Sequence, residues 1–406
     1  MTNARVYKAP QRQSYDVVII GGAVMGASVA YWLTQNPDFG GTILVVERDG
    51  SFEFASTSLA SSVIRQQYSN PVNVLMSQFG VEVIRNFKTR MQNFYPAGQA
   101  PDLGFKENGM LFTCTFGEVE AAKARVDMQR SIGAHTVFLS PAEIKARFPY
   151  INVDDIGGAS WGTEAEGWFD NVGLMTGFRV AARGGGADLI ENEVVAIGRD
   201  RDTVTNVTLA TGEVISCGMV VNASGPRANR TAQMAGLEIP VEPRRRDTFI
   251  FACAEAFPTN TPQIVDISGA FCRPEGKFFL AGHPAATDGP ADYDDFRTDF
   301  DLFEQGVWPA LAHRVPKFEA IKLQRSWTGH YEFNTLDQNA IIGPHSEVKN
   351  FIFINGFSGH GLQQSAAAGR GVSELIVYGS FATLELRDLG YERIAANRPF
   401  LEAAVI

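Results

Sequence analysis

The stretch VVIIGGAVMGASVAYWL, residues 17–33, has no charged residue and contains three glycines. A membrane helix needs about 20 apolar residues, so the length alone allows a short span. The composition changes within the stretch, however. Residues 17–20 are all β-branched, as in a buried parallel strand, whereas residues 27–33 favour a helix, and Asp16 directly precedes the run. These features predict a strand, a glycine turn and a helix rather than a membrane span.

The glycine turn comprises Gly21, Gly22, Ala23, Val24, Met25 and Gly26. In a dinucleotide-binding fingerprint the first glycine makes the tight turn and the last lets helix and strand pack closely. The middle glycine is replaced by Ala23, whose methyl group is expected to crowd a pyrophosphate. A second strand, 42–46, leads to Glu47, 21 residues after Gly26 and about where an acid accepts hydrogen bonds from an adenosine ribose. The order of these features predicts a nucleotide-binding unit.

Length, composition and charge limit the class of protein and the partners that are expected. A chain of 406 residues with 45% hydrophobic residues can form two or three domain-sized cores. A net charge of −10 argues against nucleic acid or anionic lipid as partners. The four cysteines are far apart without a CxxC pair, so neither a metal site nor a disulfide framework is expected, and the cytoplasm is the expected compartment. The N-terminus lacks the apolar segment of a secretory signal, although a short transit peptide stays open.

Further signals lie far along the chain. Helical patterns are found at 71–91, 117–132 and 170–182, the last with Asp170 as the expected N-cap. Strand-to-glycine junctions recur as VVNASG and FIFINGFSGHG, the second before a helix predicted over 362–378. Because the junctions are dispersed, the nucleotide-binding domain is expected to consist of separated segments. The predicted division is a nucleotide-binding domain of 14–90, 160–238 and 330–400, and a substrate domain of 91–159 and 239–329.

Four motifs carry a family resemblance: VVIIGGAVMG with Glu47, STSLASSVIRQQYS, VVNASG and NGFSGHGLQQSAAAGRG. With these motifs the sequence resembles the D-amino acid oxidase family of FAD-dependent oxidoreductases, which includes glycine and sarcosine oxidases. The resemblance extends from Tyr15 to about Gly379. The stretch SSVIRQQYSNPVN is also similar to a mitochondrial FAD-containing respiratory assembly factor of this family. The resemblance implies an α/β (α+β) fold: a Rossmann-like FAD-binding domain of the glutathione-reductase type, and a substrate domain with a mixed β-sheet.

The resemblance also implies where FAD binds. Backbone N–H groups at the start of the helix after GFSGHG would face the flavin pyrimidine, since a helix N-terminus favours negative charge. The hydroxyl run 56–58 would pass the pyrophosphate, although such a run is often only a solvated loop. No cysteine stands near Gly329, where some relatives tether FAD, so FAD is expected to be noncovalent, with a tether at His330 left open. The expected cofactor-binding residues are Gly21, Gly22, Ala23, Val24, Met25, Gly26, Glu47, Arg48, Ser56, Thr57, Ser58, Ser61, Ser62, Val194, Ala223, Ser224, Gly225, Gly329, Gly359, His360, Gly361, Leu362 and Gln363.

For the substrate, Arg65 in VIRQQY matches the family arginine that binds a carboxylate, which arginine does with two parallel hydrogen bonds. The sequence departs from sarcosine oxidases at two lysines. Gln363 replaces one, and Phe279 stands at the lysine that activates oxygen; Lys277 either substitutes for it or is simply exposed. The cluster 244–246 is best interpreted as a solvated strand. The catalytic candidates are Arg65, Lys277, His283, His330, Tyr331 and Gln363.

The resemblance implies oxidation of the C–N bond of a small amino acid by FAD, with hydrolysis of the imine that forms. The amine must be neutral for this reaction, so a nearby base or a lowered amine pKa is required. The expected partners are a small amino-acid or amine substrate and O₂ or another electron acceptor. The surplus of donors near Arg65 predicts a secondary amine with two carboxylates, iminodiacetate, ahead of sarcosine. A dehydrogenase and a non-catalytic flavin-binding assembly factor are the alternatives.

Overall fold

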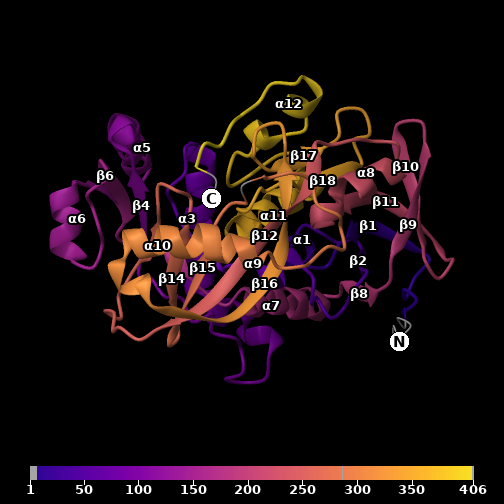
Figure 1. The fold of residues 1–406 in the computed structure, drawn as a ribbon. Helices are drawn as coiled ribbons and strands as arrows, with labels where there is room; N and C mark the ends of the chain where they lie inside the picture. The colour runs from indigo at the N-terminus through magenta and orange to yellow at the C-terminus, as the bar shows by residue number, and fades with distance from the viewer. Residues whose placement is uncertain (1–6, 286, 405–406) are drawn as a thin grey trace.

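The structure, a computed structural model, describes residues 7–285 and 287–404. Two eight-stranded sheets dominate it (Figure 1). The first sheet has the order β17-β18-β11-β1-β2-β8, with β10 paired to β11 and β9 paired to β10. Its strands are β1 (Ser14–Ile20), β2 (Ile43–Glu47), β8 (Asp188–Glu191), β9 (Val194–Asp200), β10 (Thr203–Leu209), β11 (Val214–Asn222), β17 (Ile341–Pro344) and β18 (Phe351–Asn355).

The centre of this sheet is parallel, because β1 pairs in parallel with β11 and β2. Successive residues of β1 enter two different cores: Val17 and Ile19 lie in one apolar cluster, Val18 and Ile20 in another on the opposite face. A parallel strand covered on both faces has to be apolar at every position. This explains the uncharged run from which the strand–turn–helix prediction started, and that prediction is confirmed.

Helices cover the face of the first sheet to which Val17 and Ile19 point. They are α1 (Val24–Gln35), α3 (Pro71–Arg85), α7 (Asn171–Gly184) and α11 (Gly361–Tyr378), which contribute apolar residues to one cluster. The other helices are α2 (Ser56–Leu59), α4 (Phe87–Met91), α5 (Val119–Ser131), α6 (Pro141–Arg147), α8 (Ala228–Met234), α9 (Phe300–Leu302), α10 (Trp308–Arg314) and α12 (Glu392–Ala395). None of the helices in the described part of the chain has the length and apolar character needed to cross a membrane.

The second sheet has the order β16-β12-β15-β14-β13-β4-β6-β5 and is mixed, since β13 and β4 are parallel and its other pairs antiparallel. The α/β class with a mixed second sheet, predicted from the sequence, is confirmed. The strands are β4 (Met110–Cys114), β5 (Thr136–Leu139), β6 (Gly158–Gly162), β12 (Val241–Cys253), β13 (Gln263–Val265), β14 (Phe271–Glu275), β15 (Phe278–Gly282) and β16 (Ile321–Asn334). A short ribbon of β3 (Val63–Ile64) and β7 (Gly167–Trp168) completes the fold.

Within the second sheet, the long strands β12 and β16 pair from Val241 with Asn334 to Cys253 with Ile321. The loop after β18 lies against the end of β16, where Ser358 N donates to the Glu332 carbonyl at 3.1 Å. The glycine-rich loop of the first sheet is thereby fixed to an edge strand of the second. The boundaries predicted between the two domains stay a prediction.

Candidate functional site

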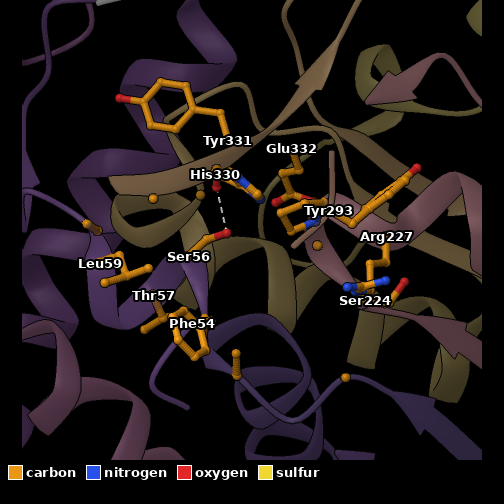
Figure 2. Close-up of a pocket in the computed structure, with 18 of the residues that line it drawn as sticks. Phe54, Ser56, Thr57, Leu59, Ser224, Arg227, Tyr293, His330, Tyr331 and Glu332 are labelled. Carbon is orange, nitrogen blue, oxygen red and sulfur yellow. Dashed lines mark hydrogen bonds between the residues drawn. The ribbon is translucent and has the colours of Figure 1, made fainter. Parts of the chain in front are cut away.

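A cavity of about 790 Å³ lies at the C-terminal ends of the parallel strands. Gly21 lines it after β1, Glu47 at the end of β2, Ala223 after β11 and Gly359 in the loop after β18. In open α/β sheets this edge is where ligands bind. Figure 2 shows Ser224 and Arg227 together at one side of the cavity and Leu59 and Tyr331 at the other.

The glycine turn packs too tightly for side chains at two positions. Gly21 has φ +101°, and a Cβ there would lie 2.3 Å from the carbonyl oxygen of Ala223. A Cβ on Gly26 would lie 1.9 Å from the Gly21 oxygen. Ala23, where the fingerprint expects glycine, has an extended backbone, caps α1 and lines the cavity. The turn is therefore held against the ends of both β1 and β11.

Glu47 fastens this turn from the other side. Its Oε2 accepts a hydrogen bond from Gly22 N at 2.7 Å and its Oε1 accepts one from Asp49 N at 2.9 Å. Burial raises the pKa of its carboxyl group, while these backbone donors and Arg179 act against the rise. Arg179 also donates to the Gly22 carbonyl at 2.8 Å. A carboxylate with two bonds keeps lone pairs for a ligand hydroxyl, so Glu47 can hold both the turn and a ribose.

The start of α1 presents a positive end to the cavity. Its first turn has no acidic residue, and Val24 N donates to Thr57 Oγ1 at 3.3 Å. Arg227 and Arg230 line the same cavity. Arg227 pairs with Asp294 at 2.6 Å, and the Arg230 guanidinium stacks 3.8 Å from the Tyr293 ring centre. A cavity lined by a helix N-terminus and by arginines is a suitable environment for phosphate groups.

His330 packs into the wall of the cavity. Its ring stacks on Phe296 with the centroids 4.4 Å apart, and Phe296 also contacts Phe54. Burial lowers the pKa of His330, so the ring is neutral near pH 7. The ring nitrogen Nε2 lies 2.8 Å from the Asp295 carbonyl and donates to it. Ser56 Oγ donates to the backbone carbonyl of His330 at 2.7 Å, the dashed bond in Figure 2.

Most of the residues predicted to bind the cofactor line this large cavity. Gly22, Gly26, Ser58 and Ser62 line neither this cavity nor the small cavity beside it. The predicted residues on the large cavity are Gly21, Ala23, Val24, Met25, Glu47, Arg48, Ser56, Thr57, Ser61, Val194, Ala223, Ser224, Gly225, Gly329, Gly359, Gly361 and Leu362.

A second, small cavity of about 30 Å³ adjoins the large one. It contains the remaining two predicted cofactor residues, His360 and Gln363, together with Arg65, Val63 and Gln263. The residues that line both cavities are Ser61, Phe271, Tyr331 and Gly359. The small cavity is thus separated from the cofactor-sized one by a single layer of residues.

Arg65 is the charged group of the small cavity, and only 1% of its surface is exposed. Its guanidinium donates to the carbonyls of Gln67 and Ala404, lies 3.2 Å from His360 Nε2, and stacks 4.2 Å from the Tyr68 ring centre. Arginine has no acceptor, so His360 Nε2 must accept. Burial and the arginine charge both lower the pKa of His360, which keeps the ring neutral. Within residues 7–285 and 287–404, no carboxylate forms an ion pair with Arg65.

Gln363 is tied to the same arginine by its side chain. The Gln363 Oε1 accepts a hydrogen bond from the backbone N of Arg65 at 2.9 Å. The loop after β18 and the strand β3, almost 300 residues apart, are joined by this bond. Gln363 therefore positions Arg65 as well as lining the small cavity.

The other predicted catalytic residues are placed differently. His283 lines the large cavity, with Nδ1 2.6 Å from the Pro284 carbonyl, and Tyr331 lines both cavities. Lys277 is exposed in the turn between β14 and β15 and lines neither cavity that the described residues form. Arg246 lines the large cavity but makes two bonds to Asp288, at 2.7 and 2.9 Å.

Sequence reasoning missed several polar residues of these cavities, among them Arg227 and Arg230. Glu332, on the large cavity, accepts a hydrogen bond from Gly356 N at 3.1 Å, and burial raises the pKa of its carboxyl group to about 8. Gln263 lies on the small cavity. Successive residues of a strand point to opposite faces, so the position of Glu332 directly after Tyr331 in β16 gave no signal, and Gln263 offers none in the sequence either.

Comparison with known proteins identifies the family. The family model described as "FAD dependent oxidoreductase" matches residues 16–375. The chain belongs to this FAD-dependent oxidoreductase family. FAD is therefore the cofactor, as the sequence predicted, and the family assignment made from the motifs is confirmed.

Three similar proteins put this assignment in context. "FAD-dependent oxidoreductase domain-containing protein 1" of Xenopus laevis is 37% identical, over 96% of this chain and 85% of the relative. The sarcosine oxidase subunit beta of an Arthrobacter species is 27% identical, over 88% of this chain and 86% of that one. The crystal structure of L-proline dehydrogenase from P. horikoshii is 25% identical with a TM-score of 0.83, over 95% of this chain and 99% of that one.

The large cavity fits FAD. Its volume is in the range of sites for large organic ligands, and the turn of Gly21 and Gly26 lets backbone approach where side chains would collide. Glu47 is available to a ribose, the start of α1 with Arg227 to the phosphates, and Gly361 at the start of α11 to the flavin. The charged arginine pocket of this FAD-dependent oxidoreductase thus lies directly beside the large cavity.

Proposed function

We propose that this FAD-dependent oxidoreductase oxidises the C–N bond of a small amino acid whose carboxylate is bound by Arg65. The observation that carries the proposal is the state of that guanidinium. It is buried at the small cavity, its hydrogen-bond partners are two carbonyls and a neutral imidazole, and its charge acts on the buried Glu166 carboxyl group without forming an ion pair with it. A buried cation is costly unless a negative charge accompanies it, so a substrate carboxylate is the partner that such a site favours.

FAD, when bound, accepts the hydride from the substrate α-carbon. The residues of the chain bind and orient the substrate. Arg65 holds the carboxylate and Gln363 fixes Arg65, so that the α-carbon faces the large cavity. His360 stays neutral and adds no second charge to the small cavity. Water then hydrolyses the imine to an amine and an oxo acid or an aldehyde.

A secondary amino acid such as sarcosine or iminodiacetate is the substrate class that we propose. The names of two similar proteins point the same way, because sarcosine and proline are both secondary amino acids. The second carboxylate of iminodiacetate requires a further cation. Arg244 and Arg246 are both paired with Asp288, and Lys277 is exposed in a turn. Sarcosine is therefore expected to be oxidised at least as well as iminodiacetate.

A dehydrogenase is a second candidate, favoured by Phe279. Phe279 stands where the family resemblance expects a lysine that activates oxygen, and its ring packs against Phe251, Phe257 and Phe318. Among the described residues no lysine lines either cavity. An electron acceptor such as a quinone or an electron-transfer protein then reoxidises the flavin in place of O₂.

The decisive experiment is anaerobic mixing of the purified yellow protein with sarcosine, iminodiacetate, L-proline and D-alanine. Loss of the oxidised-flavin absorbance with an N-substituted amino acid supports C–N oxidation. If no compound bleaches the flavin, the enzymatic proposal fails and the non-catalytic flavin-binding alternative gains support. Reoxidation of the reduced protein by air and by a soluble quinone, compared at equal concentrations, separates an oxidase from a dehydrogenase.

A further inference from the structure

Gln263 is a polar residue of the small cavity to which the proposed reaction gives no role. It is the first residue of β13, only 1% of it is exposed, and it lines the cavity together with Arg65 and Gln363. Its side-chain oxygen Oε1 is fully buried and has no hydrogen-bond partner within the described ranges 7–285 and 287–404.

A buried amide oxygen without a partner is unfavourable, since it has lost water and gained nothing in exchange. Among the described residues, no other polar group of the cavity donates a hydrogen bond to Gln263 Oε1. Gln363 Oε1 is itself an acceptor and already binds Arg65 N, while the Arg65 guanidinium donates to carbonyls and to His360. The residues that line the small cavity thus include a cation and, from another strand, a side-chain acceptor that needs an N–H or O–H donor.

The backbone of Gln263 is rigidly placed. Its N donates to the Gly109 carbonyl at 3.1 Å, and its strand pairs in parallel with β4 through Met110. On the other side Ile264 pairs with Cys272 of β14, the strand whose Phe271 separates the two cavities. The side chain therefore leaves a strand whose backbone is fixed before a ligand binds.

We propose that Gln263 determines specificity by accepting a hydrogen bond from the substrate amine N–H while Arg65 holds the carboxylate. This inference rests on the proposed carboxylate site. A ligand with both groups satisfies the cation and the acceptor together. An otherwise identical carboxylate with an ether oxygen in place of N–H places two acceptors face to face and is rejected.

Two rigid carboxylates test this without turnover. Pyrrole-2-carboxylate carries an N–H next to its carboxylate, and furan-2-carboxylate has an oxygen at the same position. Each is titrated into the FAD-loaded protein, and the dissociation constant is taken from the perturbation of the flavin absorption spectrum. We expect the wild-type protein to bind the pyrrole acid about tenfold more tightly.

The Gln263→Met substitution keeps the side-chain length and removes the amide. It is expected to weaken the pyrrole acid about five- to tenfold and to leave the furan acid unchanged or tighter, which abolishes the preference. Gln129→Met is the matched control. Gln129 is also buried and its Oε1 also lacks a partner among the described residues, but it lies on α5, its Nε2 donates to the Tyr68 carbonyl, and it lines neither the large nor the small cavity.

The outcomes separate the two proposals. Equal wild-type affinity for the two acids, or equal weakening of both by Gln263→Met, overturns the role of Gln263 and leaves the carboxylate site standing. Failure of both acids to bind the FAD-loaded wild-type protein overturns the carboxylate site and the role of Gln263 with it. The wild-type comparison needs no variant, so it decides the matter even if Gln263→Met does not fold.

Discussion

Gly26 should tolerate no side chain, and the structure gives the size of the effect. In Gly26→Ala the new Cβ would lie 1.9 Å from the Gly21 oxygen, whereas ordinary contact begins at 3.4 Å. The turn and α1 must therefore separate by about 1.5 Å. Overpacking of this kind costs about 1–3 kcal/mol, and the displaced turn also strains the bond from Gly22 N to Glu47. We expect a loss near the upper limit, about 3 kcal/mol.

The assay measures flavin content and thermal unfolding of the purified variant. The expected result is substoichiometric FAD and a melting temperature lower by about 5 °C, because the turn lines the cofactor cavity. Gly40→Ala is the control, since a Cβ there meets no atom within 4 Å, and its effect should stay within about 0.5 kcal/mol. A Gly26→Ala protein with full FAD content and unchanged melting would refute the packing argument.

Three other predictions follow from single residues. Arg65→Ala should raise KM for the substrate by the factor that corresponds to the loss of about 1.5–3 kcal/mol of binding free energy from a charge-assisted contact. Unchanged steady-state kinetics would remove Arg65 from the site. Glu332, whose folded pKa of about 8 exceeds the ordinary 4.5, adds stability that is complete below pH 4.5 and lost as the pH rises through 8. Glu332→Gln should therefore melt with a flatter pH dependence between about pH 4.5 and 8, and parallel profiles would contradict this assignment. Acid precipitation should release FAD into the supernatant, because no cysteine is available near Gly329 as a tether; flavin retained in the pellet would show a covalent link.

The local elements could be predicted because their causes are local. The helix predicted at 170–182 is α7, and the Asp170 side chain accepts from Gly173 N at 2.8 Å as a helix cap. The helix predicted at 117–132 is α5, but the one predicted at 71–91 is divided into α3 and α4 at Asn86. The division occurs at an asparagine, a residue that competes with helical hydrogen bonds, and its side chain donates to the Glu82 carbonyl.

The site was only partly predictable, because its geometry depends on contacts between distant segments. The family motifs indicated Arg65 and Gln363, which the structure brings within one hydrogen bond. Lys277 stands two residues before Phe279, so in a continuous strand the two side chains would point to the same face. The strand begins only at Phe278, however, and the lysine therefore lies in the exposed turn. Gln263 was missed because a missing hydrogen-bond partner is a property of the packed structure and leaves no pattern in the sequence.

The interleaving of the two sheets along the chain has a consequence for how the protein is assembled. β1 pairs with β11, about 200 residues later, and β11 pairs with β18 after most of the second sheet has intervened. Closing such long loops before their contacts form makes folding slow, and neither sheet is encoded by a continuous segment. A cut in a surface loop should therefore leave fragments that stay associated, and neither fragment should refold alone.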